Sequence, residues 1–423
     1  MRFTGRVRIV VGLVAVLGIA VGAHLALQPH PAYYYDERGR AHYARGDYDR
    51  AIADFDKAVA LDPDFAGAYY GRGRAYYGTS DYDHAIADYD KATALEPERA
   101  DVYYARGLAY YCKSDYDHAI ADYDKATALK PERADVYYAR GLAYANGKRD
   151  YDRAIADYDT ATALKPDYAD GYHNRGEAYY RKGNFDRAIA EYDRTIALRP
   201  DDARAFNDRG NAHNEKGDHG RAIADYDKAI ALEPGLAEAY YNRGGTFYDA
   251  GDYDRAITDY DKAICLKPDY AKAYMNRGSA YANKGERDLA IADYDKAIAL
   301  KPDFADAYYG RGYVFCLKGE FDRAISDCDK ALALKPDYPD ALIARGSAYG
   351  GGKHDYGRAA ADFAKAIALK PDDPLAYSNR ATSWCDRKDY DKAWADVKRC
   401  RELGATPDPG FIENLQKASG RRE

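Results

Sequence analysis

Residues 237–270 read AEAYYNRGGTFYDAGDYDRAITDYDKAICLKPDY, and this stretch recurs with variations along most of the 423-residue chain. Its proline belongs to a series spaced 34 residues apart, with two steps of 35. A fixed period of this length is typical of solenoids, in which similar units stack on one another. The sequence therefore predicts a repeat protein. The series comprises Pro63, Pro97, Pro131, Pro166, Pro200, Pro234, Pro268, Pro302, Pro336 and Pro371.

Within this stretch the apolar residues follow a helical period twice. Tyr240, Gly244 and Phe247 fall on one face of a first helix. Asp252 is placed to cap the start of a second helix, and Gly251 permits the tight turn before it. Each unit is therefore predicted to be a pair of helices. The apolar stripe of the second helix consists of Ala256, Ile257, Tyr260, Ala263 and Ile264.

The stretch resembles the tetratricopeptide repeat (TPR) family when Ala237 is numbered as position 1. That family has aromatic residues at positions 4, 11 and 24, a small residue at 8, alanine at 20 and 27, and proline at 32. The resemblance extends from Ala32 to about Leu403 and implies an all-α, right-handed α-solenoid of about eleven helical hairpins. The units begin at Ala32, Ala66, Ala100, Ala134, Ala169, Ala203, Ala237, Ala271, Ala305, Pro339 and Pro374.

The N-terminal segment, residues 1–31, differs from the repeats. Arginines at positions 2, 6 and 8 precede an uncharged run from Ile9 to Leu27, which has the length needed to cross a bilayer. An uncleaved membrane anchor is favoured because the run continues past Ala23, the place where a signal peptide would be cut. A cleaved signal peptide is the alternative. Both place the repeats on the non-cytoplasmic side, which is the periplasm if the source is bacterial.

The C-terminal end is predicted to cover the stack. The solenoid is assigned to residues 32–409, and residues 410–423 are assigned to a capping helix and tail. Phe411 to Ala418 reads as one amphipathic helix. Such a helix would shield the open apolar end of the last repeat, as solenoids require.

Composition and motifs exclude several classes of function. The net charge is −7, which gives no support to nucleic-acid binding. The sequence has no glycine-rich phosphate loop, no GxSxG and no HExxH, and its nine histidines are scattered. We therefore expect no catalytic residue, no cofactor, no metal site and no small-molecule substrate. Six cysteines show no CxxC spacing. Buried free thiols are the expected state, with Cys316–Cys328 and Cys385–Cys400 pairs as alternatives.

Arginine occupies position 7 of every repeat, from Arg38 to Arg380, where the family commonly has leucine. A periodic ribbon of arginines could bind anions. However, every repeat also has a carboxylate at position 23, from Asp54 to Asp396. The matching number favours pairing between the two helices of each repeat over an anion track.

The resemblance also implies a binding surface, because positions 2, 5, 6, 9, 12 and 13 of the first helix line the concave groove in this family. Tyrosine is frequent there, and rigid amphipathic side chains are common binding anchors. Asparagine recurs at position 6, where some family members use it to hold the backbone of an extended peptide. Simple enrichment of tyrosine by copying of repeats is the alternative. The predicted partner-binding residues are Tyr70, Tyr77, Tyr104, Tyr111, Tyr138, Asn174, Asn242, Asn276, Tyr309 and Tyr313.

Two repeats have one extra residue, around Asn146–Asp150 and Gly350–His354. We expect both insertions in the turn between the paired helices, where they disturb packing least. The predicted function is a non-enzymatic scaffold that binds a peptide or helix of a partner protein in its groove. The alternatives are a substrate-docking subunit of a separate envelope enzyme complex and a self-associating structural component.

Overall fold

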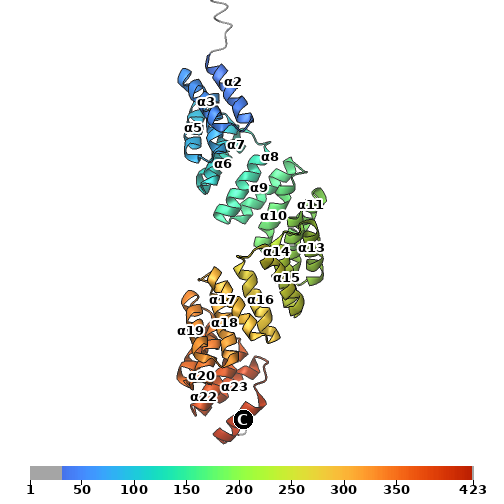
Figure 1. Cartoon of the computed structure of the whole chain (residues 1–423), viewed down its shortest axis with the longest axis vertical. Coiled ribbons are helices and arrows are strands. Elements are labelled where there is room, and N and C mark those ends of the chain that lie inside the picture. Colours follow the sequence, from blue (N-terminus) through green and yellow to red (C-terminus); the bar gives the residue numbers. More distant parts are fainter. Residues whose placement is uncertain (1–30, 422–423) are drawn as a thin grey trace, which may run out of the picture. The chain divides into compact units, whose positions relative to one another are not determined.

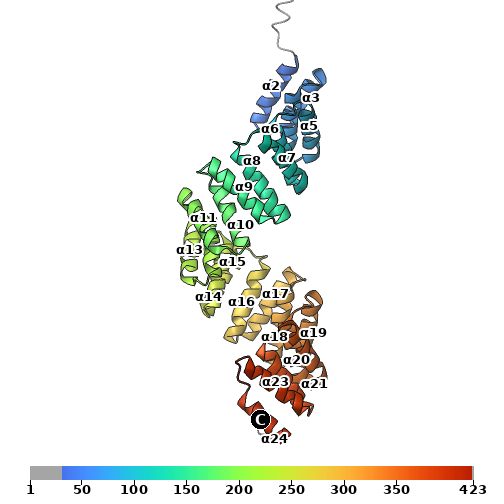
Figure 2. The ribbon, with the colours of Figure 1, turned by 180° about the vertical axis from the view of Figure 1, so that it is seen from behind.

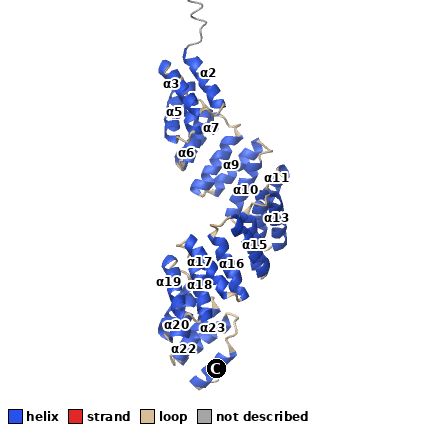
Figure 3. Ribbon diagram, in the orientation of Figure 1, coloured by secondary structure: helices blue, strands red, loops and turns tan. Residues whose placement is uncertain are grey.

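The computed structural model describes residues 31–421 and is helical throughout this part of the chain, with no strand (Figure 3). Its 23 α-helices comprise eleven consecutive hairpins and a final helix, α24 (Pro409–Ser419). The prediction of an all-α fold of about eleven hairpins is therefore confirmed. The predicted membrane segment, Ile9 to Leu27, lies outside the described residues. Within residues 31–421 no helix is both long and apolar enough to span a bilayer.

Each hairpin consists of a first helix and a second helix joined by a short turn. The first helices are α2 (Pro31–Ala44), α4 (Ala66–Gly78), α6 (Ala100–Cys112), α8 (Ala134–Leu142), α10 (Ala169–Arg181), α12 (Ala203–Glu215), α14 (Ala237–Asp249), α16 (Ala271–Lys284), α18 (Ala305–Lys318), α20 (Pro339–Lys353) and α22 (Pro374–Asp386). The second helices are α3 (Tyr48–Leu61), α5 (Tyr82–Leu95), α7 (Tyr116–Leu129), α9 (Tyr151–Leu164), α11 (Phe185–Leu198), α13 (His219–Leu232), α15 (Tyr253–Leu266), α17 (Arg287–Leu300), α19 (Phe321–Leu334), α21 (Tyr356–Leu369) and α23 (Tyr390–Glu402).

The chain divides into two compact halves between Pro200 and Asp201, with five hairpins in the first and six in the second. Within each half, a second helix packs on the first helix of its own repeat and on the first helix of the next repeat (Figures 1 and 2). First helices of successive repeats also touch one another. Each repeat thus buries its apolar stripe against its neighbours, as a solenoid requires.

The turn between the helices has the local chemistry that the sequence predicts. In the seventh repeat, Gly251 adopts the left-handed conformation with φ of 77°, which a glycine reaches without steric cost. Asp252 then accepts a hydrogen bond from the Arg255 amide at 3.1 Å. This contact satisfies one of the free amides at the start of α15. The predicted cap at Asp252 is confirmed.

The glycine at position 8 is required by the aromatic ring at position 24. A Cβ atom added to Gly244 would lie 2.9 Å from Cε1 of Tyr260, and one added to Gly107 would lie 2.6 Å from Cε1 of Tyr123. The second helix therefore lies so close to the first that only glycine fits beneath the ring. The last repeat has Ala381 in this place, where the residue at position 24 is the smaller Val397.

Two adjacent glycines in α14 allow a matched test of this contact. We expect Gly244→Ala to destabilise α14 and α15 by about 1–3 kcal/mol, since its methyl group overpacks against Tyr260. Gly245→Ala places its methyl group 3.9 Å from the nearest atom, the Tyr260 hydroxyl. It should stabilise the helix by about 0.5–1 kcal/mol because alanine is the better helix former. Hydrogen exchange in the two helices measures both effects, and equal effects of the two substitutions would contradict the close contact.

The two extra residues lie in helical turns and not in the loop, which corrects the expectation. In the fourth repeat the chain continues from α8 into a π-helical segment, η1 (Ala143–Lys148). In the tenth repeat, α20 extends to Lys353. In both repeats the wider turn passes directly over an aromatic side chain of the preceding repeat. A Cβ atom on Gly147 or Gly352 would lie 2.1 Å from that ring, so these glycines are needed for packing.

The arginines at position 7 pair with the carboxylates at position 23, as predicted. In ten repeats the arginine Nε and Nη2 atoms donate to the two oxygens of an aspartate at 2.5–2.9 Å. This bidentate geometry joins the two helices of a hairpin. The pairs are Arg38–Asp54, Arg72–Asp88, Arg106–Asp122, Arg140–Asp157, Arg209–Asp225, Arg243–Asp259, Arg277–Asp293, Arg311–Asp327, Arg345–Asp362 and Arg380–Asp396.

The same arginines also bind a second carboxylate, which the sequence analysis missed. Arg106 Nη1 donates to Asp90 of the preceding repeat at 2.6 Å. The guanidinium therefore ties together three helices from two repeats. The other contacts of this kind are Arg72–Asp56, Arg140–Asp124, Arg175–Asp159, Arg243–Asp227, Arg277–Asp261, Arg311–Asp295 and Arg345–Asp329.

The fifth repeat departs from this arrangement because its carboxylate is Glu191. Arg175 donates only Nη2 to Glu191, at 2.7 Å. Its Nε atom is buried and has no hydrogen-bond partner. The additional methylene of glutamate thus replaces a bidentate contact with a single one.

Exchanging aspartate and glutamate at position 23 tests the energy of this geometry. We expect Glu191→Asp to stabilise the fifth repeat by about 1 kcal/mol, because Arg175 Nε gains an acceptor. The reverse exchange, Asp122→Glu in the third repeat, should cost about 1 kcal/mol since Arg106 Nε loses its acceptor. Local hydrogen exchange in α10–α11 and α6–α7 measures the two changes. Shifts of the same sign would contradict the interpretation.

The last helix covers the end of the stack. Leu415 of α24 is completely buried against a cluster that includes Val397 of α23. Trp394 Nε1 donates to the Ser419 hydroxyl at 3.2 Å. The helix therefore occupies the place of a further repeat. All six cysteines are free thiols, and Cys328 and Cys400 are buried.

Candidate partner-binding site

All ten predicted binding residues lie on first helices. We call the side chains at positions 2, 5, 6, 9, 12 and 13 of these helices the first-helix face. Nine of the ten predicted residues are half-buried, and only Tyr313 is more open, with 45% of its surface exposed. The N-terminal half places Tyr70 and Tyr77 on α4, Tyr104 and Tyr111 on α6, Tyr138 on α8 and Asn174 on α10; the C-terminal half places Asn242 on α14, Asn276 on α16, and Tyr309 and Tyr313 on α18.

The tyrosines at position 5 are held from two sides. The Tyr104 ring packs 6.1 Å from the Tyr123 ring, and the Arg133 guanidinium lies 4.6 Å from the centre of the Tyr104 ring. Tyr138 packs likewise between Tyr158 at 5.9 Å and Tyr168 at 4.9 Å. The covering residue, Arg133 or Tyr168, stands at position 34. These rings therefore have a packing role as well as a partly open surface.

Tyr70 and Tyr309 are also covered by the residue at position 34, although position 24 of the ninth repeat is Cys328 and not a tyrosine. Tyr70 is covered by Arg99 at 4.9 Å, and Tyr309 by Tyr338 at 5.1 Å between ring centres. Burial raises the pKa of Tyr70, Tyr104 and Tyr309, and it raises the pKa of Tyr138 to about 12. These hydroxyls are therefore neutral at pH 7 and available as hydrogen-bond donors and acceptors.

The asparagines at position 6 bind to the preceding repeat. Asn174 Nδ2 donates to the Tyr138 hydroxyl at 2.8 Å and to the Asp170 carbonyl at 3.0 Å. Asn276 Nδ2 donates to the Tyr241 hydroxyl at 3.1 Å. Asn242 Nδ2 donates to Asn207 Oδ1 at 3.0 Å. Both amide protons of Asn174 are thus used within the chain, and its carbonyl oxygen is the group that remains to hold a peptide backbone.

The residues at positions 12 and 13 also join adjacent repeats. Asn146 Nδ2 donates to the Tyr111 hydroxyl at 2.8 Å, and the Tyr77 hydroxyl lies 3.4 Å from the Cys112 sulfur. Asn283 Nδ2 donates to the Tyr248 hydroxyl at 2.8 Å. Polar contacts therefore join several pairs of neighbouring first helices, from α4 to α10 in the first half and from α12 to α16 in the second.

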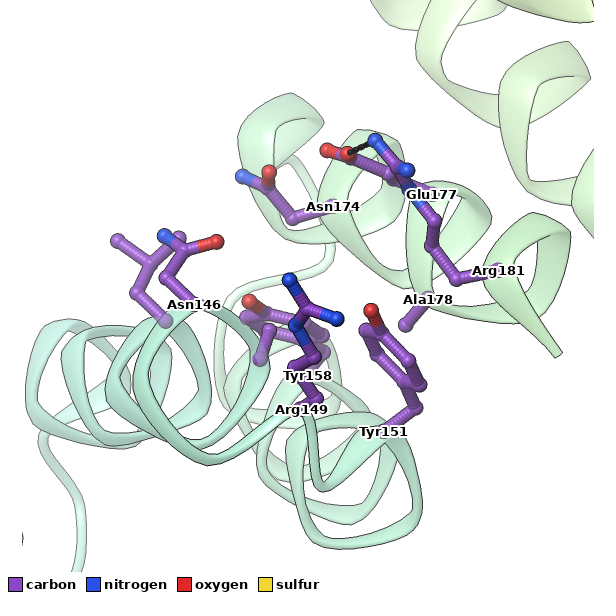
Figure 4. Close-up of a pocket in the computed structure, with 10 residues that line it drawn as sticks. Asn146, Arg149, Tyr151, Tyr158, Asn174, Glu177, Ala178 and Arg181 are labelled. Atoms are coloured by element: carbon purple, nitrogen blue, oxygen red, sulfur yellow. Dashed lines mark hydrogen bonds and ion pairs between the residues drawn. The ribbon is translucent and has the colours of Figure 1, made fainter. Parts of the chain in front are cut away.

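A cavity of about 300 Å³ opens on this face between the fourth and fifth repeats (Figure 4). One wall comes from α8, η1 and the start of α9, and α10 forms the opposite wall. Arg149 extends into the space between the walls, and Arg181 pairs with Glu177 at 3.2 Å. The lining residues are Leu142, Ala145, Asn146, Arg149, Tyr151, Tyr158, Asn174, Glu177, Ala178 and Arg181.

The C-terminal half contains a cavity at the equivalent place. It has a volume of about 290 Å³ and lies beside the extended turn of the tenth repeat. His354 stands where Arg149 stands in the fourth repeat, and Asn379 stands where Asn174 stands in the fifth. A further cavity of about 340 Å³ lies between the first and second repeats, and its lining includes Tyr43, Tyr70 and Arg74.

Metal chemistry finds no support in this arrangement. Residues 31–421 contain no group of histidine, cysteine, aspartate and glutamate side chains that could hold an ion. The groups that line the first-helix face are mainly hydroxyls, amides and aromatic rings, with charged side chains such as Asp101, Asp208 and Glu177 among them. They can form hydrogen bonds and bury apolar surface, which are the interactions of a binding surface.

Comparison with known families supports the repeat assignment. A model described as "TPR repeat" matches residues 39–80, 73–114, 110–147, 148–183 and 244–285, and a second, described as "Tetratricopeptide repeat", matches 173–237 and 275–339. The chain belongs to the tetratricopeptide repeat family. As a TPR protein it is a protein–protein interaction scaffold. No curated protein matches the chain significantly.

Solved structures contain the same fold. The APC/C hetero-tetramer Cut9–Hcn1 superposes with a TM-score of 0.52 at 16% identity, covering 95% of this chain and 98% of that one. MamA is 31% identical over 38% of this chain and 94% of its own length, with a TM-score of 0.35. YrrB, described as a TPR protein with an unusual peptide-binding site, is 25% identical over 44% of this chain and 95% of its own, with a TM-score of 0.37.

Some features of this TPR face were missed in the sequence. The cavity beside Arg149 follows from the one-residue insertion, which is visible in the sequence but was expected to lengthen the loop. The covering residues at position 34 also went unnoticed, although Arg99 and Arg133 each follow a position-5 tyrosine by 29 residues, and Tyr168 follows Tyr138 by 30 because of the extra residue. That periodic spacing is the signal that could have identified them.

Proposed function

We propose that this TPR protein is a non-enzymatic scaffold whose first-helix face binds an extended peptide or a helix of a partner protein. The observation that carries the proposal is the row of position-5 tyrosines, such as Tyr104 and Tyr138, each fixed by packing and each partly open. Rigid aromatic side chains lose little conformational entropy when a partner covers them. Their neutral hydroxyls offer hydrogen bonds at the same surface.

The arrangement of the arginines supports a protein partner over a nucleic acid. A nucleic-acid surface needs unpaired basic side chains to neutralise phosphates. At position 7, the guanidinium groups are engaged by aspartates or a glutamate in all eleven repeats of the described chain. These ion pairs, which the sequence favoured over an anion track, leave no position-7 arginine of residues 31–421 without a carboxylate partner.

We further propose that the N-terminal segment anchors the protein in a membrane, with the repeats on the non-cytoplasmic side. Support comes from the sequence alone: an uncharged run from Ile9 to Leu27 preceded by three arginines. Cleavage of the segment as a signal peptide would instead give an exported soluble protein.

The identity of a co-purifying protein separates the scaffold from its alternatives. Isolation of the tagged chain from its native membranes should recover a partner that binds through the first-helix face. Recovery of one stoichiometric enzyme would favour a substrate-docking subunit. Recovery of the chain alone as an oligomer would favour a self-associating component.

Replacing the two central tyrosines tests the proposed face. We expect Tyr104→Ala with Tyr138→Ala to weaken partner binding about tenfold or more, because two fixed aromatic anchors are lost. Titration calorimetry with the recovered partner measures the affinity. Tyr104→Phe with Tyr138→Phe is the matched control, since it keeps both rings and should retain most of the affinity. Unchanged affinity of the alanine variant, with helical content preserved, would count against the proposal.

The mass of the purified protein tests the proposed anchor. An uncleaved anchor predicts a membrane-extracted chain that retains residues 1–31. A mature chain that starts near His24 would show signal-peptide cleavage. Intact-mass spectrometry distinguishes the two products, whose masses differ by more than 20 residues.

A further inference from the structure

We propose that the cavity beside Arg149 accepts an acidic side chain, aspartate or glutamate, of the segment bound on the first-helix face. This inference deepens the proposed function and rests on it. It assigns a charge preference to one place on a face that combines aromatic, amide and charged side chains.

The cavity results from the extra residue of the fourth repeat. In an ordinary repeat such as the seventh, the Asp252 amide donates to the Phe247 carbonyl, five residues earlier. In the fourth repeat the Asp150 amide donates to the Tyr144 carbonyl, six residues earlier, at 3.0 Å. The extra residue widens the end of the first helix into the π-helical segment η1. Such insertions within helices are frequent at functional sites.

Arg149 occupies a backbone position that usually requires glycine. Its φ of 52° and ψ of 27° lie in the left-handed region, where most other repeats have a glycine such as Gly183 or Gly251. A side chain other than glycine costs about 1 kcal/mol there. This conformation holds the guanidinium at the cavity, facing the α10 residues of the opposite wall (Figure 4).

Arg149 is the uncompensated charge of the cavity. The guanidinium forms no hydrogen bond or ion pair with any side chain of residues 31–421. In contrast, the charges of Glu177 and Arg181 neutralise each other across 3.2 Å. A carboxylate placed beside Arg149 would accept two parallel hydrogen bonds, the geometry that a guanidinium favours. The apolar side chains of Leu142 and Ala178 offer contacts to the methylene groups of such a side chain.

The cavity of the tenth repeat has the same form but different chemistry. Its left-handed residue is His354, with φ of 54°, whose Nδ1 lies 3.0 Å from the Tyr356 hydroxyl. Asp386 stands where Arg181 stands in the first cavity. The insertion therefore produces the space in both repeats, and the left-handed residue sets its charge. Of these two insertion cavities, the one beside Arg149 combines the space with a cation that has no carboxylate partner among residues 31–421.

Peptide selection on the full chain tests the inference without knowledge of the natural partner. Random dodecapeptides displayed on phage are selected on the full-length protein in detergent, and the best binders are synthesised. We expect these peptides to share an aspartate or glutamate at one position, and its replacement by asparagine or glutamine should weaken binding about tenfold. Arg149→Gly should cause the same loss, because it removes the guanidinium from a backbone conformation that glycine adopts freely.

When the peptide with asparagine or glutamine binds the Arg149→Gly variant, the two losses of affinity should not add, because each change removes the same interaction. Arg153→Ala removes a nearby arginine that pairs with Asp150 outside the cavity, and it should leave affinity unchanged. The inference would be overturned if the selected peptides shared no acidic residue, or if they bound the Arg149→Gly variant as tightly as the unchanged protein. Displacement of the peptide by millimolar acetate would overturn the assignment to a peptide side chain.

The Tyr104→Ala, Tyr138→Ala variant separates this inference from the proposed function. Peptides that lose affinity for that variant but not for Arg149→Gly would overturn the carboxylate site and leave the proposed face intact. Selection of no binding peptide at all would overturn both.

Discussion

The guanidinium at position 7 is the interaction on which the fold of each half depends. In most interior repeats one arginine binds a carboxylate of its own second helix and another carboxylate of the preceding repeat, as Arg106 does with Asp122 and Asp90. The planar guanidinium fixes both the direction and the length of its hydrogen bonds to these carboxylates. Loss of such an arginine would leave a carboxylate buried without a partner, which costs several kcal/mol. The ion pairs therefore set the spacing of helices whose remaining contacts are largely non-directional.

Much of this fold could be predicted because its determinants lie close together in the sequence and recur. Asp252 caps α15 three residues from the amide it binds, and Gly244 and Tyr260 belong to one 34-residue unit. The pairing of positions 7 and 23 was also predictable, since arginine and carboxylate occur in equal numbers. The second partner at position 25 was missed because it belongs to the neighbouring repeat, and stacking geometry alone brings it within reach.

The binding face was predicted in position but not in detail. Its tyrosines lie on the first helices as expected, and their use by a partner remains a prediction. The sequence did not reveal that Tyr138 is covered by Tyr168, or that the amide of Asn174 is already engaged by Tyr138. The insertion near Asn146 was visible, but its placement depends on whether the helix or the loop absorbs the extra residue. That choice depends on packing of Gly147 against Tyr116 of the preceding repeat, which no local pattern encodes.

The absence of an aspartate at one place gives the C-terminal half a mechanical asymmetry. Ala364 stands at position 25 of the tenth repeat, so Arg380 binds Asp396 of its own hairpin and has no carboxylate to grip in the preceding one. In contrast, Arg345 of the tenth repeat donates a hydrogen bond to Asp329 of the ninth. Among the described residues of this half, the junction before α22 is thus the one that lacks the ion pair between repeats, and we expect it to separate first under a stretching force. The final hairpin and α24 would then separate together, while the repeats before them remained packed on one another.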